Sequence, residues 1–216
     1  MRKETLAQIF LTILGVILIY AAVAFNVKIG IGVGPVDAAI TSIAQITNMK
    51  VGTFSMIFHG SFFLVQLAIN KRNFQAKDFL QLFFIIGGGA IWNFFLYIVL
   101  KNVEFTFYPV RLLAFVLANV MSAFGCLLVL DMNIMKIPVE SCLQLLADKR
   151  SATLGAYRQI TDVILLILSV VLILTFDTEW TVREGTIISA LIFGPMLDFL
   201  RKHVVSKWSF AVQTQE

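Results

Sequence analysis

Residues 34–37 read Gly-Pro-Val-Asp, and residues 137–140 read Ile-Pro-Val-Glu. The two prolines are 103 residues apart, and the same spacing separates Gly52 from Gly155 further along the chain. A constant spacing over an ungapped stretch predicts a chain built from two copies of one unit. In a membrane protein, the relative orientation of two such copies decides which mechanisms are possible.

The composition is that of a membrane protein. Hydrophobic residues make up 59% of the 216 residues and charged residues only 14%, against about 45–50% and about 25% in soluble domains. No linker-like stretch divides the chain, so we expect a single membrane domain over 1–216 whose surroundings are the lipid bilayer. The net charge of +4 comes from basic residues in short loops between apolar runs, and we expect no nucleic-acid partner.

Six segments approach the roughly 20 apolar residues that a membrane span requires. Two further apolar segments, 35–47 and 138–147, are too short to cross the bilayer at about 1.5 Å per residue. The predicted fold is therefore all-α: a polytopic helical bundle with six spans and two short helices. The six predicted spans are 6–26, 51–70, 79–100, 109–131, 153–175 and 184–200.

The distribution of Lys and Arg predicts the topology. With the N-terminus in the cytoplasm, eleven of the 17 basic residues lie on the cytoplasmic side, five lie outside, and Arg158 falls within a span. This bias favours both termini in the cytoplasm. Repeat one is then 1–103 and repeat two 104–216. Three spans per copy is an odd number, so the second copy is inverted relative to the first.

The two short segments begin alike. Each has a proline at a plausible first helical position, which suits proline because it has no N–H to leave unpaired. Each also has an acid two residues later, near the positive end of the helix dipole. One interpretation is a pair of interfacial amphipathic helices; the other is a pair of half-helices that enter the membrane from opposite faces. Their polar stripes, at i, i+4 spacing, are Asp37, Thr41 and Gln45 in the first and Glu140, Gln144 and Asp148 in the second.

Charged and titratable residues inside spans are the candidate site. Arg158 and Asp162 share one face of a helix and can pair, and the repeat aligns them with Ser55 and His59. A charge at mid-membrane is costly and should face protein or water. A structural ion pair and a hydrogen-bonded packing histidine are the alternatives to a site role.

A weaker similarity between the two copies aligns Asn93 with Asp198. Hydrogen bonding between helices is the alternative to a site role for these two residues. The candidate substrate-binding residues are Asp37, His59, Asn93, Glu140, Arg158, Asp162 and Asp198. Cys126 and Cys142 match no metal spacing, and we find no catalytic triad order, phosphate loop or haem motif. We therefore expect no metal, no cofactor and no enzymatic activity.

Several motifs resemble the YczE/YyaS/YitT-like bacterial membrane proteins. The run 30–38, Gly-Ile-Gly-Val-Gly-Pro-Val-Asp-Ala, is similar to their G-x-G-P-x-D-A signature, and Tyr157-Arg158 with Asp162 resembles a later element. The closing element is similar to Gly185-Thr186-Ile187 followed by Gly194-Pro195. The second copy departs from the pattern, since 135–140 reads Met-Lys-Ile-Pro-Val-Glu. The resemblance implies an inner-membrane protein, often presumed a transporter, and supplies no substrate.

These observations favour a transporter or permease for a small solute or ion, with its site near the midplane between inverted repeats. One alternative is a substrate-binding membrane subunit of a multi-component importer, which would need partner subunits. Another is a membrane scaffold or regulator that transports nothing. A homodimer is also possible in each case.

Overall fold

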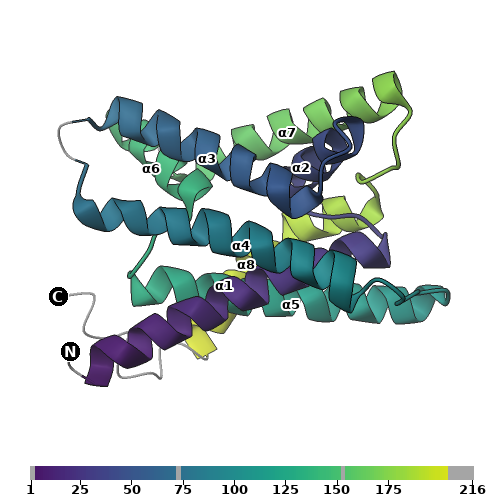
Figure 1. Ribbon diagram of the computed structural model, residues 1–216, viewed down its shortest axis with the longest axis horizontal. Helices are drawn as coiled ribbons and strands as arrows, with labels where there is room; N and C mark the ends of the chain where they lie inside the picture. Colours follow the sequence, from purple (N-terminus) through teal and green to yellow (C-terminus); the bar gives the residue numbers. More distant parts are fainter. Residues whose placement is uncertain (1–2, 72–73, 152–153, 204–216) are drawn as a thin grey trace.

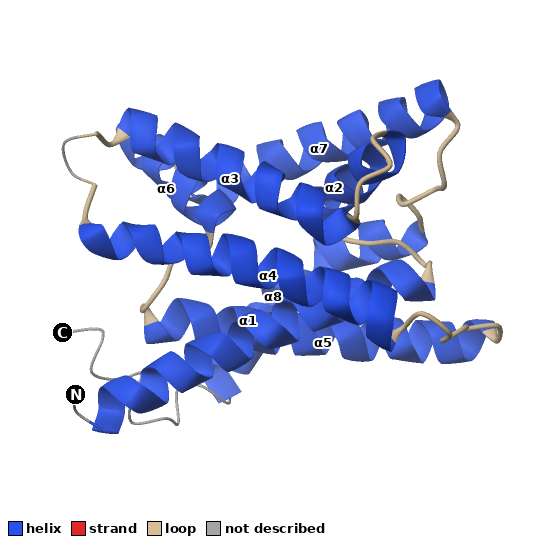
Figure 2. Ribbon diagram, viewed as in Figure 1, coloured by secondary structure: helices blue, strands red, loops and turns tan. Residues whose placement is uncertain are grey.

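The computed structural model describes residues 3–71, 74–151 and 154–203. Within these ranges every regular element is a helix, as Figure 2 shows. In chain order the elements are α1 (Lys3–Ile29), α2 (Pro35–Ile46), α3 (Val51–Ile69), the short 3₁₀ helix η1 (Ala76–Leu80), α4 (Gln81–Phe94), the π-helical turn η2 (Phe95–Val99), α5 (Tyr108–Met132), α6 (Pro138–Lys149), α7 (Leu154–Phe176) and α8 (Glu184–His203).

Five helical segments are long and apolar enough to cross a membrane. They match the first five predicted spans and are Leu6–Ile29, Val51–Ile69, Ala76–Val99, Tyr108–Met132 and Ala156–Phe176. The sixth predicted span lies in α8, where the apolar stretch Glu184–Phe193 is shorter. Large apolar side chains cover the outside of the bundle; Phe83 and Leu191 are each 71% exposed. A surface of this kind is suited to lipid rather than to water.

The helix boundaries recur at the spacing that the sequence shows. The starts of α2 and α6, of α3 and α7, and of α4 and α8 are each 103 residues apart, as are the ends of α1 and α5. Backbone conformations recur as well. Gly30 and Asn133 both have positive φ, and so do Asn48 and Ser151, again at a spacing of 103 residues. The predicted starts at Pro35 and Pro138 are confirmed.

The long helices run side by side along the longest axis of the molecule (Figure 1). α1 and α5 run in opposite directions and share the most extensive helix–helix contact among the described residues. They meet at Gly15 and Gly125, where a Cβ on Gly15 would lie 2.7 Å from the Gly125 carbonyl oxygen. Small residues at such a crossing let two backbones approach closely.

The two short helices lie towards opposite ends of the bundle, α6 at the left and α2 at the right of Figure 1. Each packs against both α3 and α7. Their first turns belong to the same apolar core, which contains Val36 of α2 and Ile137, the residue just before α6, together with Trp92 of α4. The beginnings of α2 and α6 therefore reach the interior of the bundle.

Candidate functional site

An arginine with two acidic partners lies at the contact between α6 and α7. The Nε of Arg158 donates to both carboxylate oxygens of Asp162, each at 3.0 Å, one helical turn away. One of its terminal nitrogens donates to Oε1 of Glu140 on α6. The predicted pairing of Arg158 with Asp162 is therefore present, and Glu140 joins it as a partner from the neighbouring helix.

A third carboxylate is close enough to this ion pair to interact with its charges. Asp37, in the first turn of α2, interacts electrostatically with Arg158, Asp162 and Glu140. We call Asp37, Glu140, Arg158 and Asp162 the central cluster. With its acids ionised, the cluster carries three negative charges against one positive charge. Because unbalanced charge is costly away from water, this excess is suited to protons or to a positively charged group of a ligand.

The local sequence explains how two of these acids reach the interior. Asp37 and Glu140 each follow the first residue of their helix, a proline, by two positions. Acids are favoured there because the helix dipole places partial positive charge at the N-terminus. Both helices begin at the apolar core, so their acidic first turns lie within the bundle, where the Glu140 side chain is 28% exposed.

His59 and Tyr20 are two buried polar side chains that interact electrostatically with the central cluster. His59 is 7% exposed, and its Nδ1 lies 2.9 Å from the Ser55 carbonyl oxygen and 3.2 Å from the Ser55 hydroxyl. It interacts electrostatically with Glu140 and Arg158. Its ring is 6.4 Å from that of Tyr20, edge to face. The alignment of His59 with Asp162 in the sequence thus corresponds to proximity to the same cluster.

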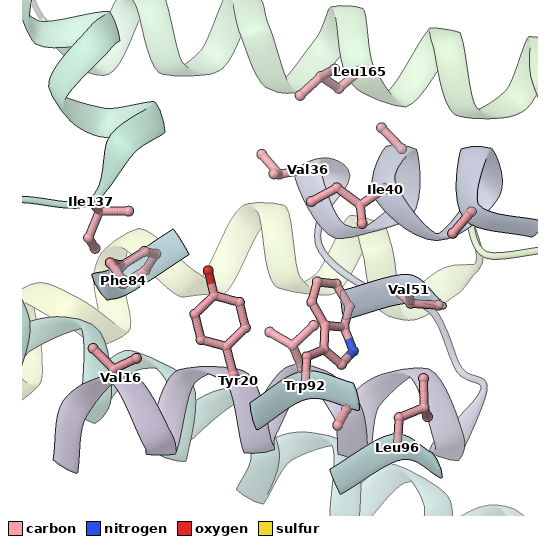
Figure 3. Packing of buried hydrophobic residues seen from close by; sticks show 14 of the residues in the cluster. Val16, Tyr20, Val36, Ile40, Val51, Phe84, Trp92, Leu96, Ile137 and Leu165 are labelled. Carbon is pink, nitrogen blue, oxygen red and sulfur yellow. The ribbon is translucent and has the colours of Figure 1, made fainter. Parts of the chain in front are cut away.

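The sequence analysis did not single out Tyr20. Figure 3 shows it rising from α1 among Phe84, Trp92 and Val36, with its hydroxyl directed towards the short helices. The hydroxyl lies near Ser55 and interacts electrostatically with Asp37 and Glu140, yet it makes no hydrogen bond of normal geometry among the described residues. A tyrosine in an apolar run carries no periodic signal that separates it from ordinary core residues.

Two predicted site residues do not join the central cluster. The Asn93 side chain accepts from the Gly52 N–H at 2.9 Å and donates to the Thr53 hydroxyl at 3.0 Å, so it caps the first turn of α3. This is the inter-helix hydrogen bonding that was the alternative to a site role. Asp198 falls within α8, and its side chain lies outside the described part of the chain.

Depth along the helices places the cluster near the middle of the bundle. Asp162 of the cluster and His59, which interacts with the cluster, each stand eight residues beyond the start of their helix, or about 12 Å at the helical rise. Among the described residues no group of three or more His, Cys, Asp or Glu is arranged to hold a metal ion. The chemistry available is ion pairing, hydrogen bonding and proton exchange at carboxylates, an imidazole and a phenol.

The fold and this cluster define an all-helical protein with several helices long and apolar enough to cross a membrane and a cluster of charged side chains among its helices. The chain belongs to DUF6198, a family of unknown function whose model matches residues 6–202. No curated protein and no solved structure matches the chain.

Proposed function

We propose that this protein is a transporter for a small solute or ion, with the central cluster as its binding site. The observation that carries the proposal is the gathering of three carboxylates, two of them at helix N-termini, around Arg158 within an apolar bundle. The side chains of Arg158, Glu140 and Asp162 are 34%, 28% and 25% exposed, so a solute can reach them. A scaffold has no need for four charged side chains at this depth, because each costs free energy there. A binding site for a charged or polar solute needs them.

The two halves act as inverted repeats in this proposal. The packing supports the assignment, because α2 of the first half packs on α7 of the second while its counterpart α6 packs on α3. The α1–α5 contact gives further support. At a spacing of 103 residues the partners of Gly15 and Gly125 are Ala118 and Ala22, which are also small and are 5% and 0% exposed.

In this proposal the chain crosses the membrane six times, with α8 as the sixth span. Both termini are in the cytoplasm of a bacterial cell, α2 enters from outside and α6 from the cytoplasm. Broken or half-spanning helices whose N-termini meet at the midplane are a recurring way to build solute sites in transporters. The YczE/YyaS/YitT-like resemblance is compatible with this role, and the proposal requires no enzymatic step.

An unbiased uptake screen tests the proposal. Proteoliposomes containing the purified chain are incubated with a mixture of polar bacterial metabolites, washed, and their contents measured by mass spectrometry. We expect at least one solute to accumulate above the level in protein-free liposomes, and Arg158→Ala to abolish that accumulation. Equal accumulation in protein-free liposomes would reject the transporter proposal. Unchanged accumulation in Arg158→Ala would reject the central cluster as its binding site.

The same preparation separates the transporter from an importer subunit. A chain that transports in pure liposomes needs no partner for that activity. Co-purification of an ATPase, together with solute binding but no transport in liposomes, would instead favour the binding subunit.

A further inference from the structure

A cavity separate from the central cluster opens between α1, α2 and the 177–183 segment that connects α7 to α8. Its volume is about 510 Å³, and its walls include Asn26, Thr41, Gln45, Glu179, Trp180 and Arg183. We call it the α1–α2 pocket. Its size lies within the range of small-molecule sites, about 300–1,000 Å³.

Three residues that line this pocket carry buried side-chain oxygens that lack partners. Oδ1 of Asn26, Oγ1 of Thr41 and Oε1 of Gln45 make no hydrogen bond among the described residues, although Asn26 and Thr41 are only 6% and 3% exposed. An unsatisfied buried polar group costs about 1–3 kcal/mol. Asn26, Thr41 and Gln45 line one cavity and each carries an oxygen able to accept a hydrogen bond, which suits a ligand that donates several N–H groups.

The rim of the pocket presents a cation and an acid. Arg183 is exposed and lines the pocket. Its Nε donates to the Trp180 carbonyl at 3.2 Å and one terminal nitrogen donates to the Gly30 carbonyl at 2.9 Å. The other terminal nitrogen has no partner among the described residues and can bind a ligand. Glu179 and the exposed Trp180 ring stand on the same rim.

The pocket walls are tied together by the fold. The Ser42 and Thr181 hydroxyls, 2.9 Å apart, join α2 to the 177–183 segment. The Gly30 carbonyl also accepts from Arg111 at 2.8 Å, so this turn remains anchored if Arg183 is replaced. The pocket is therefore a preformed feature rather than a gap between independent segments.

We infer that the α1–α2 pocket binds a small zwitterionic solute of the amino-acid type. Its ammonium group donates to the Asn26, Thr41 and Gln45 oxygens, and its carboxylate binds the free nitrogen of Arg183. A simple anion would leave the three acceptors without donors, whereas a simple cation would be repelled by the positive charge of Arg183.

This inference rests on the proposed function and extends it to a substrate class. Asp37, Thr41 and Gln45 form one stripe of α2 at i, i+4 spacing, with about 6 Å between successive members. The stripe connects the pocket, at the C-terminal half of α2, with the acidic central cluster at its first turn. A zwitterion bound beside Thr41 in the pocket would thus lie one helical turn of α2 away from Asp37 in the central cluster.

Four solutes with the same four-carbon length test the charge requirement. The full chain in lipid nanodiscs is incubated with radiolabelled 4-aminobutyrate, and binding is measured by scintillation proximity. Unlabelled 4-aminobutyrate, putrescine, succinate and 1,4-butanediol serve as competitors. We expect 4-aminobutyrate to compete at least about tenfold better than the other three, because only the zwitterion makes charge-assisted hydrogen bonds at both ends.

Two variants locate the binding in the pocket. Thr41→Val removes the buried hydroxyl without a change of shape, and Arg183→Gln removes the carboxylate partner. We expect each to weaken 4-aminobutyrate binding by about tenfold, and Arg183→Gln also to bring putrescine level with 4-aminobutyrate or ahead of it. Thr47→Val, an exposed position at the end of the same helix, is the matched control and should bind like the unaltered chain.

The inference is overturned if 4-aminobutyrate does not bind, if succinate, putrescine or butanediol competes equally well, or if both pocket variants bind normally. Its failure is distinguishable from failure of the transporter proposal. Uptake of some other solute without 4-aminobutyrate binding would remove only the substrate class, whereas zwitterion binding without any uptake would remove only transport.

Discussion

Arg158 and Glu140 are joined by an ion pair between α7 and α6, 18 residues apart in the sequence. The pair links the acidic first turn of a short helix to the interior of a long one. Because Arg158 also holds Asp162 and interacts with Asp37, it is the residue through which the acids of the central cluster are kept together.

The strength of this link can be measured with a double-mutant cycle. The side chains are 34% and 28% exposed, so the coupling should exceed the 0.2–1 kcal/mol of surface pairs but stay below the roughly 3–5 kcal/mol of buried ones. We expect about 1–2 kcal/mol from the unfolding free energies, in lipid–detergent micelles, of Arg158→Met, Glu140→Gln and the double variant. Strict additivity would show that the ion pair contributes nothing to stability.

Two adjacent glycines on α4 should respond oppositely to alanine. A Cβ on Gly88 would collide with the Tyr20 ring, whereas a Cβ on Gly87 would meet nothing within 4 Å. We expect Gly88→Ala to destabilise the protein by about 1–3 kcal/mol through overpacking, and Gly87→Ala to be neutral or to stabilise it by up to about 1 kcal/mol. Thermal unfolding of both variants checks this, and equal effects would contradict the packing around Tyr20.

Asn93 should matter for stability but not for solute binding. It supplies a partner for the Gly52 N–H in the first turn of α3, and loss of a helix cap typically costs about 0.5–2 kcal/mol. We therefore expect Asn93→Leu to lower the unfolding free energy by about 1 kcal/mol while the apparent affinity for any transported solute is unchanged. If Asn93→Leu has an unchanged unfolding free energy but a lower solute affinity, Asn93 is part of the binding site after all.

The sequence predicts the helices of this protein better than it predicts their contacts. Proline followed by an acid marked the starts of α2 and α6 because both preferences are local to a helix N-terminus. The Arg158–Asp162 pair followed from spacing on one helix. The position of Tyr20 and the cap made by Asn93 depend on which helices cross and at what depth, and these contacts arise from packing between segments far apart in the chain.

The proposed inversion predicts opposite accessibility for two equivalent positions. Thr47 and Arg150 are the exposed C-caps of α2 and α6, 103 residues apart. In a chain with Cys126 and Cys142 replaced by alanine, we expect a membrane-impermeant maleimide applied to intact cells to label Thr47→Cys but not Arg150→Cys. Inside-out vesicles should show the reverse.

Labelling of both cysteines from the same side would contradict the inverted arrangement. The same chain without introduced cysteines is the control for background labelling. Labelling from the same side would leave the central cluster as a structural feature but would rule out inverted symmetry between the two halves.

The most direct test of the central claim is the initial rate of uptake, in proteoliposomes, of a solute that the screen identifies. Asp162→Asn keeps the shape of the side chain but removes one charge of the cluster. Glu104→Gln makes the same change at an exposed position in the loop between η2 and α5. We predict that Asp162→Asn lowers the rate at least about tenfold in protein that remains folded, and that Glu104→Gln leaves it unchanged. Equal rates for the two variants would contradict a binding site at the central cluster.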